Sequence, residues 1–353
     1  MLSQRIKTLM PYVPGEQPRD RRYIKLNTNE NPYQPSPRIR DFLRTFDPET
    51  LRRYPDPRMT ALRQAIGRRF GLSDDCVFTG NGSDEVLAFA FYAFFDSDCG
   101  PVLFPTFTYS FYPVYCNFFD IDYRTLPLGG DYTVDLDAFA VAGKSCGAIF
   151  PNPNAPTGIG LPLDRVRSLL ERFPRDRVVI VDEAYIDFGG QSAASLIDSY
   201  NNLLVVQTFS KSMALAGIRL GFAMGAKPLI DALFTAKDAF NSYPVDTLAQ
   251  QIGVLAMEDR DHFDEICRKI VATRERFGET MTGLGWRLLP SQANFVFASK
   301  PGVPGSQIYN DLKAAGILVR YFDKEGLRDF VRITMGTDEE MDTLVEAIQR
   351  LFG

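Results

Sequence analysis

The sequence contains little histidine and little cysteine for its 353 residues. A single histidine, His262, excludes a metal site with several imidazole ligands and argues against a hydrolytic triad. Its neighbours Asp261 and Phe263 lie in a polar stretch with helical spacing, so we expect His262 at the surface. No metal site is expected.

The five cysteines are scattered, and no two have the C-x-x-C spacing: Cys76, Cys99, Cys116, Cys146 and Cys267. An odd number without a pattern is typical of reduced thiols in the cytoplasm. No apolar run approaches the ~18 residues of a membrane helix. The first residues lead into a polar, proline-rich stretch, unlike a signal peptide. We therefore expect a cytoplasmic protein.

The net charge is also small, at −5 from 39 basic and 44 acidic residues. No overall field favours nucleic acid or an anionic membrane as a partner, so an anionic ligand must be held by local groups. The apolar fraction of 45% is ordinary for a globular chain. The length predicts two domains, or one large domain with a smaller companion.

The pattern of apolar residues predicts an α/β fold. Short apolar runs alternate with longer segments of helical spacing, and most runs are continuous, as in strands covered on both faces. The expected strands are 76–79, 102–104, 121–124, 148–150, 178–181, 203–208 and 220–223. The expected helices among them are 59–70, 84–95, 108–118 and 163–172. This alternation predicts a mostly parallel central sheet flanked by helices.

Three regions are expected along the chain. Residues 1–35 are rich in proline, asparagine and charge, which predicts an arm laid over another part of the protein. Residues 36–244 contain the strand–helix alternation and form the expected large domain. Residues 245–353 contain a long helical run, short apolar segments and a final helix at 338–351, which predicts a smaller α+β domain.

Ligands of an open α/β sheet bind beyond the carboxyl ends of its strands, and two strand ends here are rich in possible donors. The first strand is followed by the helix opening 80–85, Gly-Asn-Gly-Ser-Asp-Glu. Glycines and the free N–H groups of a first helical turn suit an anion, although Ser83 could equally be an ordinary N-cap. The strand at 148–150 precedes a turn rich in proline and asparagine, residues 151–158, which is either a rigid source of amide donors or an ordinary polar loop.

Two further strand ends carry charge. Strand 178–181 runs into Asp182, with Tyr185 three residues later. A buried carboxylate needs a cation, although Asp182 could be a helix cap or part of a structural ion pair. Strand 203–208 is followed by Lys211 and then Arg219. Burial and the arginine would lower the pKa of Lys211, as an amine nucleophile requires, although a solvated loop lysine is the ordinary alternative.

Taken together, these strand ends match the needs of pyridoxal phosphate. The cofactor requires a Schiff-base amine, an acid on its ring nitrogen, donors to its phenolic oxygen and a phosphate cradle. The chain resembles fold-type I pyridoxal-phosphate enzymes in the block 210–221, Ser-Lys followed by Ala-Gly-Ile-Arg and Gly. It resembles the histidinol-phosphate aminotransferase family in Tyr-Val-Pro-Gly at 12–15, Asn-Glu-Asn-Pro at 29–32 and two C-terminal arginines. The resemblance runs from residue 11 to residue 337.

The resemblance implies roles at the cofactor ring. Lys211 would form the Schiff base and later move a proton between the substrate Cα and the cofactor C4′. Asp182 would pair with the ring nitrogen, and Tyr185 with Asn154 would hydrogen-bond the phenolic oxygen. Many relatives have asparagine directly before Pro-Thr-Gly, where this chain has Ala155, so Asn154 is the candidate one residue earlier.

The resemblance also implies contacts to the ring face and the two phosphates. Phe107 would lie on the ring face. The cofactor phosphate would be held by Gly82, Ser83, Asp84, Ser210 and Arg219. Tyr54 would reach the cofactor phosphate of the neighbouring subunit, which requires a homodimer. In the substrate site, Arg332 would hold the α-carboxylate in a bidentate fork and Arg320 the substrate phosphate, unless Arg320 is a solvated strand-end charge. Tyr12 and Asn29 from the arm would close over the substrate.

The expected function is transfer of the amino group of L-histidinol phosphate to 2-oxoglutarate, or the reverse reaction, in histidine biosynthesis. The products are imidazole acetol phosphate and L-glutamate. An aromatic amino acid aminotransferase and a pyridoxal-phosphate-dependent threonine-phosphate decarboxylase share these motifs and stay open as alternatives. A regulatory module without catalysis is disfavoured, because we expect no room before the arm for a DNA-binding domain.

Overall fold

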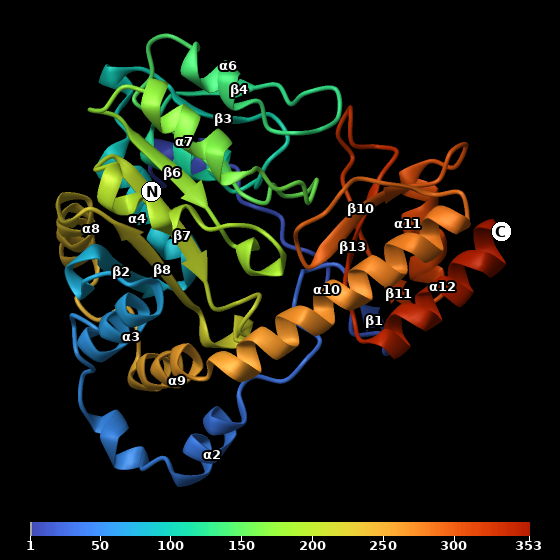
Figure 1. Cartoon of the computed structure of the whole chain (residues 1–353), viewed down its shortest axis with the longest axis horizontal. Helices are drawn as coiled ribbons and strands as arrows, with labels where there is room; N and C mark the ends of the chain where they lie inside the picture. The colour runs from blue at the N-terminus through green and yellow to red at the C-terminus, as the bar shows by residue number, and fades with distance from the viewer. Residues whose placement is uncertain (1) are drawn as a thin grey trace.

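The computed structural model describes residues 2–353; Met1, the first residue of the expected arm, lies outside them. A seven-stranded sheet with the order β2-β8-β7-β6-β5-β3-β4 forms the centre of a large unit (Figure 1). Its strands are β2 Val77–Asn81, β3 Val102–Pro105, β4 Tyr123–Leu126, β5 Gly147–Pro151, β6 Val178–Asp182, β7 Leu203–Thr208 and β8 Leu220–Gly225. β8 runs antiparallel to both of its neighbours, and the other pairs are parallel. The prediction of a mostly parallel α/β sheet is confirmed.

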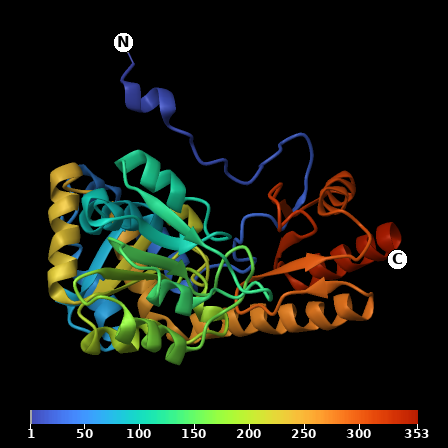
Figure 2. The same cartoon turned by 90° about the horizontal axis from the view of Figure 1, so that it is seen from above.

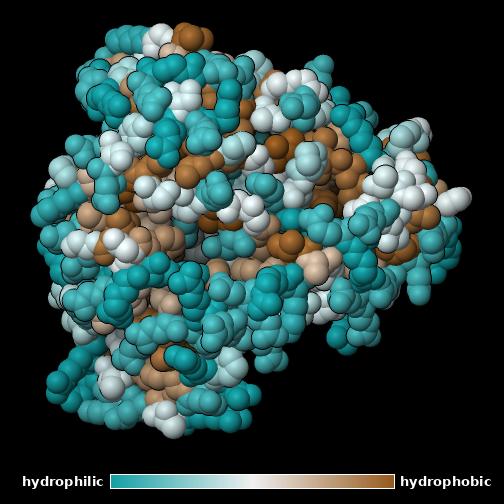
Figure 3. Space-filling model, viewed as in Figure 1, coloured by the Kyte–Doolittle hydropathy of each residue, from teal (hydrophilic) through white to brown (hydrophobic). Residues whose placement is uncertain are grey.

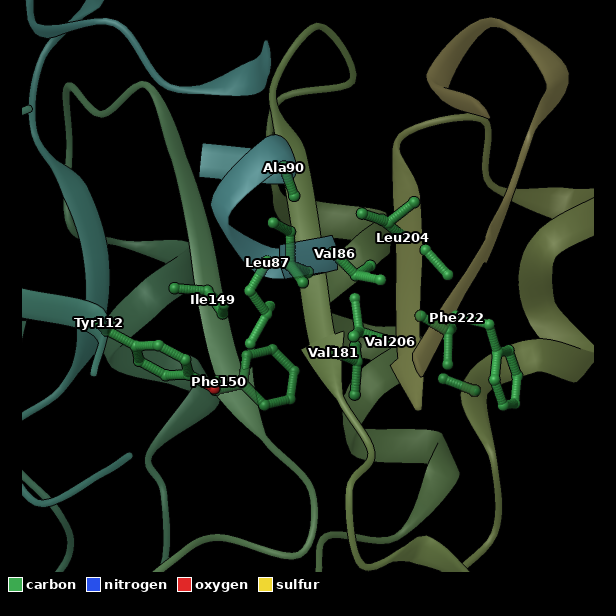
Figure 4. Close-up of a cluster of buried hydrophobic side chains, with 14 of the residues drawn as sticks. Val86, Leu87, Ala90, Tyr112, Ile149, Phe150, Val181, Leu204, Val206 and Phe222 are labelled. Atoms are coloured by element: carbon green, nitrogen blue, oxygen red, sulfur yellow. The ribbon is translucent and has the colours of Figure 1, made fainter. Parts of the chain in front are cut away.

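Helices pack on this sheet and bury its strands. They are α3 Thr60–Phe70, α4 Gly82–Phe94, α5 Tyr112–Phe119, α6 Leu136–Ala140, α7 Leu163–Arg172 and α8 Lys227–Phe240. Every residue of β5, β7 and β8 is buried, as expected of strands covered on both faces. In the core, α4 lays Val86, Leu87 and Ala90 on the sheet, near Val206 and Phe222 (Figure 4). This packing fixes the first turn of α4 beside the start of β8.

Two elements start later than the apolar pattern predicts. The helix expected at 108–118 begins at Tyr112, so that Pro113 lies in its first turn. A start at residue 108 would place Pro113 in the helix interior, where its missing N–H breaks a hydrogen bond. The strand expected at 121–124 begins at Tyr123, because the N–H of Ile121 bonds to Cys116 O and closes the preceding helix. The segment 106–111 is therefore a loop, and it reaches the site described below.

A smaller unit follows the large one in the chain. Its antiparallel sheet has the order β12-β13-β10-β9, with strands β9 Arg287–Leu288, β10 Phe295–Ser299, β12 Arg320–Tyr321 and β13 Val331–Thr334. Its helices are α10 Arg260–Gly283, α11 Gly305–Ala314 and α12 Asp338–Phe352. The long helix α10 runs from the large unit along the small one (Figure 1). Within the part of the chain that the structure describes, no helix is long and apolar enough to cross a membrane.

Two segments pack outside the region to which the sequence-based boundaries assign them. α9 (Thr247–Glu258) follows the expected boundary at residue 245, yet it packs on α3 and on α2 (Pro37–Thr45) of the large unit. The division into 36–244 and 245–353 stays a proposal, and the chain crosses to the small unit along α10. In the arm, β1 (Ile24–Lys25) pairs in parallel with β11 (Ile317–Leu318). The arm is thus tied to the small unit, while α1 (Gln4–Thr8) lies apart from both units (Figure 2).

A substitution at Gly221 on β8 tests the contact between that strand and α4. A Cβ added at Gly221 would lie 2.3 Å from Ser83 N and 2.6 Å from Gly82 C, which are backbone atoms. We therefore expect Gly221→Ala to lower the free energy of unfolding by about 1–3 kcal/mol, measured by urea denaturation. Gly278→Ala in α10 is the control, because its Cβ would meet no atom within 4 Å; it should stabilise the protein by about 0.5–1 kcal/mol. Equal stability of Gly221→Ala and the unaltered protein would contradict the tight contact.

Candidate active site

Two adjoining cavities of about 320 and 340 Å³ lie beyond the carboxyl ends of the parallel strands. The first is lined by residues that end or follow β2, β5, β6 and β7 and by Thr28 and Glu30 of the arm, and the second adds further arm residues and residues of the small unit. The residues common to both are Thr28, Asp84, Tyr109, Ala155, Tyr185, Lys211 and Arg219. Most of the polar residues predicted for the site therefore meet at these two cavities. The face of the molecule shown in Figure 3 is hydrophilic over most of its area, with hydrophobic side chains in separate patches.

Asp182 ends β6 and is buried against the first cavity. Tyr112 Oη donates a hydrogen bond to its Oδ2 at 2.8 Å, and Ala184 N–H donates to Oδ1 at 3.3 Å. Burial raises the pKa of Asp182 to about 6, while these hydrogen bonds lower it. Among residues 2–353, no lysine or arginine forms a salt bridge with Asp182. The carboxylate thus lacks a positive partner, which a protonated ring nitrogen would supply.

Lys211 lies across the same cavity, and its ammonium group is poorly solvated. Burial is the main cause that lowers its pKa, to about 8, and Arg332 lowers it further. Glu30 and Asp84 act in the opposite direction. Lys211 Nζ donates to the backbone oxygen of Thr28 at 3.1 Å. A large fraction of the amine is therefore neutral in mildly alkaline solution, as a nucleophile requires.

The first turn of α4 forms a cradle for an anion. Gly82 has a φ of 78°, and a Cβ at this position would lie 2.6 Å from Arg219 Nη2, so only glycine lets the guanidinium lie against the helix start. Arg219 Nη2 also contacts Asp84 Oδ2 at 3.1 Å, and Tyr109 Oη donates to Asp84 Oδ1 at 2.9 Å. The cradle is completed by Ser83, Thr208 and Ser210, which line the cavity. These residues fit a phosphate group.

The structure does not bring Phe107 to the cavities. Its ring packs against Gly326, where a Cβ would lie 2.7 Å from Phe107 Cζ, and Lys324 Nζ lies 5.2 Å from the ring centroid. Among the aromatic side chains of the loop 106–111, the one that lines both cavities is Tyr109, two residues later. Because 106–111 is a loop and not the first turn of a helix, a different side chain of this aromatic run faces the site.

The side chain of Asn154 is also directed elsewhere. Its Nδ2 donates to Phe107 O at 2.9 Å and to Thr157 Oγ1 at 3.1 Å. Ala155, the residue that replaces asparagine in the family pattern, lines both cavities in its place. Of the two side chains expected at the phenolic oxygen, the structure therefore brings only Tyr185 to the cavity.

The second cavity contains two arginines without acidic partners. Arg320 and Arg332 are directly opposite each other on the antiparallel pair β12 and β13, where like charges destabilise. No salt bridge to either is found within residues 2–353. Arg332 Nη2 donates to Asn27 O at 3.0 Å, and its Nε is buried without a partner. An anionic ligand between the two guanidinium groups would remove this repulsion.

The remaining predicted residues have distinct places. Tyr12 lines the second cavity and packs on Phe111, with ring centroids 5.0 Å apart. Asn29 also lines it, but its side chain bonds to Tyr185. Tyr54 lines neither cavity; its side chain is 81% exposed and stacks on Tyr243, with ring centroids 4.6 Å apart.

Several site residues have no counterpart in the sequence-based expectations. Tyr112 could have been found, because a buried tyrosine hydroxyl needs a partner and the run 107–112 is strongly aromatic. Thr28 acts through its backbone oxygen, and Glu30 through its charge near Lys211. Neither role leaves a mark in the local sequence, since both depend on where the arm lies.

The site and fold define a pyridoxal-phosphate-type aminotransferase, and comparison with known proteins supports this. Residues 21–348 match the family described as aminotransferase class I and II, and the chain belongs to that family. The chain is 58% identical to histidinol-phosphate aminotransferase of Syntrophus aciditrophicus (strain SB), over 100% of this chain and 98% of that protein. It is 49% identical to histidinol-phosphate aminotransferase of Chromohalobacter salexigens, over 98% and 97% of the two chains. Within the class, the chain is thus a member of the histidinol-phosphate aminotransferase family.

A solved structure shows the same fold. Histidinol-phosphate aminotransferase from Sinorhizobium meliloti in complex with pyridoxal-5′-phosphate superimposes with a TM-score of 0.88 at 26% identity. The match covers 99% of this chain and 98% of that one. The family and fold expected from the sequence motifs are confirmed, and the family is pyridoxal-phosphate-dependent.

The pKa of Lys211 predicts how the protein takes up its cofactor. Only the neutral amine attacks an aldehyde, so the rate of forming a borohydride-reducible link to pyridoxal phosphate should rise with pH through a midpoint of about 8. Glu30→Gln removes a negative charge that raises this pKa, so the midpoint should fall. Glu265→Gln is the control, because Glu265 pairs with Lys269 on α10 as Glu30 pairs with Lys25, and it lines neither cavity. A midpoint near the ordinary lysine value of 10.5 would contradict the burial of Lys211.

Proposed function

We propose that this chain transfers the amino group of L-histidinol phosphate to 2-oxoglutarate, and the reverse, with pyridoxal phosphate as cofactor. The observation that carries the proposal is the pair of facing arginines, Arg320 and Arg332, beside Lys211. Histidinol phosphate carries a phosphate and no carboxylate, whereas glutamate and 2-oxoglutarate each carry two carboxylates. Two adjacent guanidinium groups suit all three anions, because guanidinium binds phosphate and carboxylate in the same planar fork.

The residues of the first cavity would hold the cofactor and move the proton. The bound cofactor supplies a ring that accepts electrons from the substrate Cα. Lys211 would take the proton from the substrate Cα, and Asp182 would keep the ring nitrogen protonated. Tyr185 would donate to the phenolic oxygen, and Tyr109 would pack on the ring face in the place expected of Phe107. The phosphate would be held by the backbone N–H groups of Gly82, Ser83 and Asp84, together with Ser210 and Arg219.

The residues of the second cavity would hold the substrate. Arg332, with its unpartnered Nε, binds the carboxylate of glutamate, and Arg320 binds the phosphate of histidinol phosphate. Arg320 now donates to the backbone oxygens of Val13 and Pro14 at 3.2 and 3.3 Å. These neutral acceptors are weaker partners than a phosphate, so the substrate competes for Arg320 with the arm.

An aromatic amino acid aminotransferase is the second candidate, and a specific feature favours it. Tyr12 and Phe322 line the substrate cavity, and Arg332 lies 5.7 Å from the centroid of the Phe322 ring. Such a surface accepts a phenyl ring as well as an imidazole. The substrate phosphate, recognised by Arg320, is the feature that would separate the two activities.

We also propose a homodimer in the cytoplasm. Tyr54 is exposed beside Tyr243, and Leu51 and Phe240 are exposed as well, so apolar surface is available for a second copy. Tyr54 would reach the cofactor phosphate of the neighbouring subunit, as the family resemblance implies. The five cysteines are free thiols, which agrees with a reducing compartment.

The assignment of Arg320 predicts a change in substrate preference. In a single-turnover absorbance assay of the reconstituted protein, L-histidinol phosphate should react much faster than L-phenylalanine or L-threonine phosphate. Arg320→Gln should slow the reaction of histidinol phosphate by about 10-fold or more, as expected for a lost charged hydrogen bond, and affect phenylalanine less. Arg328→Gln, at an exposed ion pair with Asp323, is the control. Equal losses with both substrates would refute the role of Arg320, and release of CO₂ without a 2-oxo acid would favour the decarboxylase.

The shared site predicts complementation between subunits. Lys211→Ala should abolish turnover and the borohydride-reducible link, and Tyr54→Ala should weaken cofactor binding. If each site combines Lys211 of one subunit with Tyr54 of the other, mixed dimers of the two variants contain one intact site. Unfolding and refolding the variants together should therefore restore activity above that of either alone. No gain after confirmed mixing would show that Tyr54 does not act across the interface.

A further inference from the structure

The arm residue Asn29 is held rigidly against Tyr185. Its Nδ2 donates to Tyr185 Oη at 2.9 Å, and the residue is only 1% exposed. Its backbone has a left-handed φ of 56°, and its carbonyl accepts from Asn294 Nδ2 at 3.1 Å. Asparagine tolerates this conformation better than most residues. The side chain of Asn29 is thus fixed in place. Either the nitrogen or the oxygen of its amide can face Tyr185, and this choice determines which hydrogen bonds Tyr185 can make.

Thr334 decides the orientation of that amide. Its hydroxyl oxygen accepts from the Asn29 backbone N–H at 3.0 Å, and its hydroxyl proton is donated to Asn29 Oδ1 at 2.9 Å. Thr334 is 2% exposed, and a hydroxyl has a single proton to donate. In the reversed orientation the amide nitrogen would face Thr334, and the threonine proton would lose its acceptor. The observed orientation is therefore the one in which the Thr334 proton keeps its acceptor and the Asn29 amide nitrogen faces Tyr185.

The orientation of Asn29 determines what Tyr185 offers to the cavity. Because the Tyr185 oxygen accepts from Asn29, its own proton is left for another acceptor. No acceptor for that proton is found in residues 2–353, and Tyr185 lines both cavities. A reversed amide would accept the tyrosine proton, and Tyr185 would then present only lone pairs to a ligand.

We propose that Thr334 and Asn29 are positioning residues that fix Tyr185 as a hydrogen-bond donor to the phenolic oxygen of the bound cofactor. The proposal rests on the proposed cofactor site in the first cavity. It matters in this chain because the Asn154 amide is bonded to Phe107 O and Thr157, and Ala155 offers no side-chain donor. Tyr185 is then the donor on which the phenolic oxygen depends.

The consequence is spectroscopic. A donor to the phenolic oxygen stabilises its negative charge, and so lowers the pKa of the proton shared between that oxygen and the Lys211 nitrogen. Loss of the donor should therefore move the pH midpoint of the visible absorbance change upward. This midpoint is measured on the resting protein, independently of turnover.

The test is a pH titration of the visible band in protein reconstituted with pyridoxal phosphate. Tyr185→Phe removes the donor and sets the largest upward shift. Thr334→Val releases the Asn29 amide and should raise the midpoint by roughly half a pH unit, whereas Thr334→Ser keeps the hydroxyl and should keep the native midpoint. In the Tyr185→Phe background, Thr334→Val should cause no further shift.

Thr79→Val is the matched control, because Thr79 is buried on β2 and its hydroxyl has no partner; it should leave the midpoint unchanged. The proposal would be overturned if Tyr185→Phe raised the pH midpoint and Thr334→Val left it unchanged. It would also be overturned if Thr334→Val still raised the midpoint in the Tyr185→Phe background. A low melting temperature would reveal misfolding of Thr334→Val. In that case Asn29→Ser replaces it as the test variant. Asn29→Ser should also raise the pH midpoint, and it should cause no further shift in the Tyr185→Phe background. A native protein with no visible band would refute the cofactor assignment itself, a result distinct from a normal band that does not shift.

Discussion

The constraint on which the rest of this structure depends is a set of charged side chains that lack partners of opposite charge at the two adjoining cavities. Asp182 is buried without a cation, and Arg320 and Arg332 face each other without an anion. Each arrangement costs folding free energy on its own. The apolar strands and the helices packed on them hold these groups where they are, and the proposed ligands would supply the missing charges. Stability and the proposed function therefore make opposite demands on the residues of these two cavities.

The parts of the site that follow from sequence are those fixed by the strands. β6 and β7 are continuous apolar runs, so the residues after them, Asp182 and Lys211, must lie at the ligand edge of a parallel sheet. Arg320 and Arg332 are similarly fixed by short strands. The central sheet and the final helix were predictable for the same reason, since periodicity and burial are local properties of a segment.

The parts that do not follow from sequence lie in loops or depend on distant contacts. Phe107 and Asn154 are each close to the residue that lines the cavity, Tyr109 and Ala155, but a loop has no periodicity to say which side chain faces inward. Thr28 contacts Lys211 across 183 positions of the chain, and Asn29 contacts Thr334 across 305. No pattern in a local window carries such pairings, because they arise only when the arm docks on the finished sheet.

The docking of the arm has a consequence for how the protein is made. During synthesis, β1 and Asn29 are made before the large sheet, whereas their partners β11 and Thr334 are made after it. The large sheet is complete by residue 225 and can form while the chain is still growing, because domains fold as units in order of synthesis. The arm can dock only after β11 and Thr334 have been made, and closing the long loop between these partners is entropically costly and slow. Completion of the active site is therefore a late event in folding, reached only by a chain translated to its C-terminal helix.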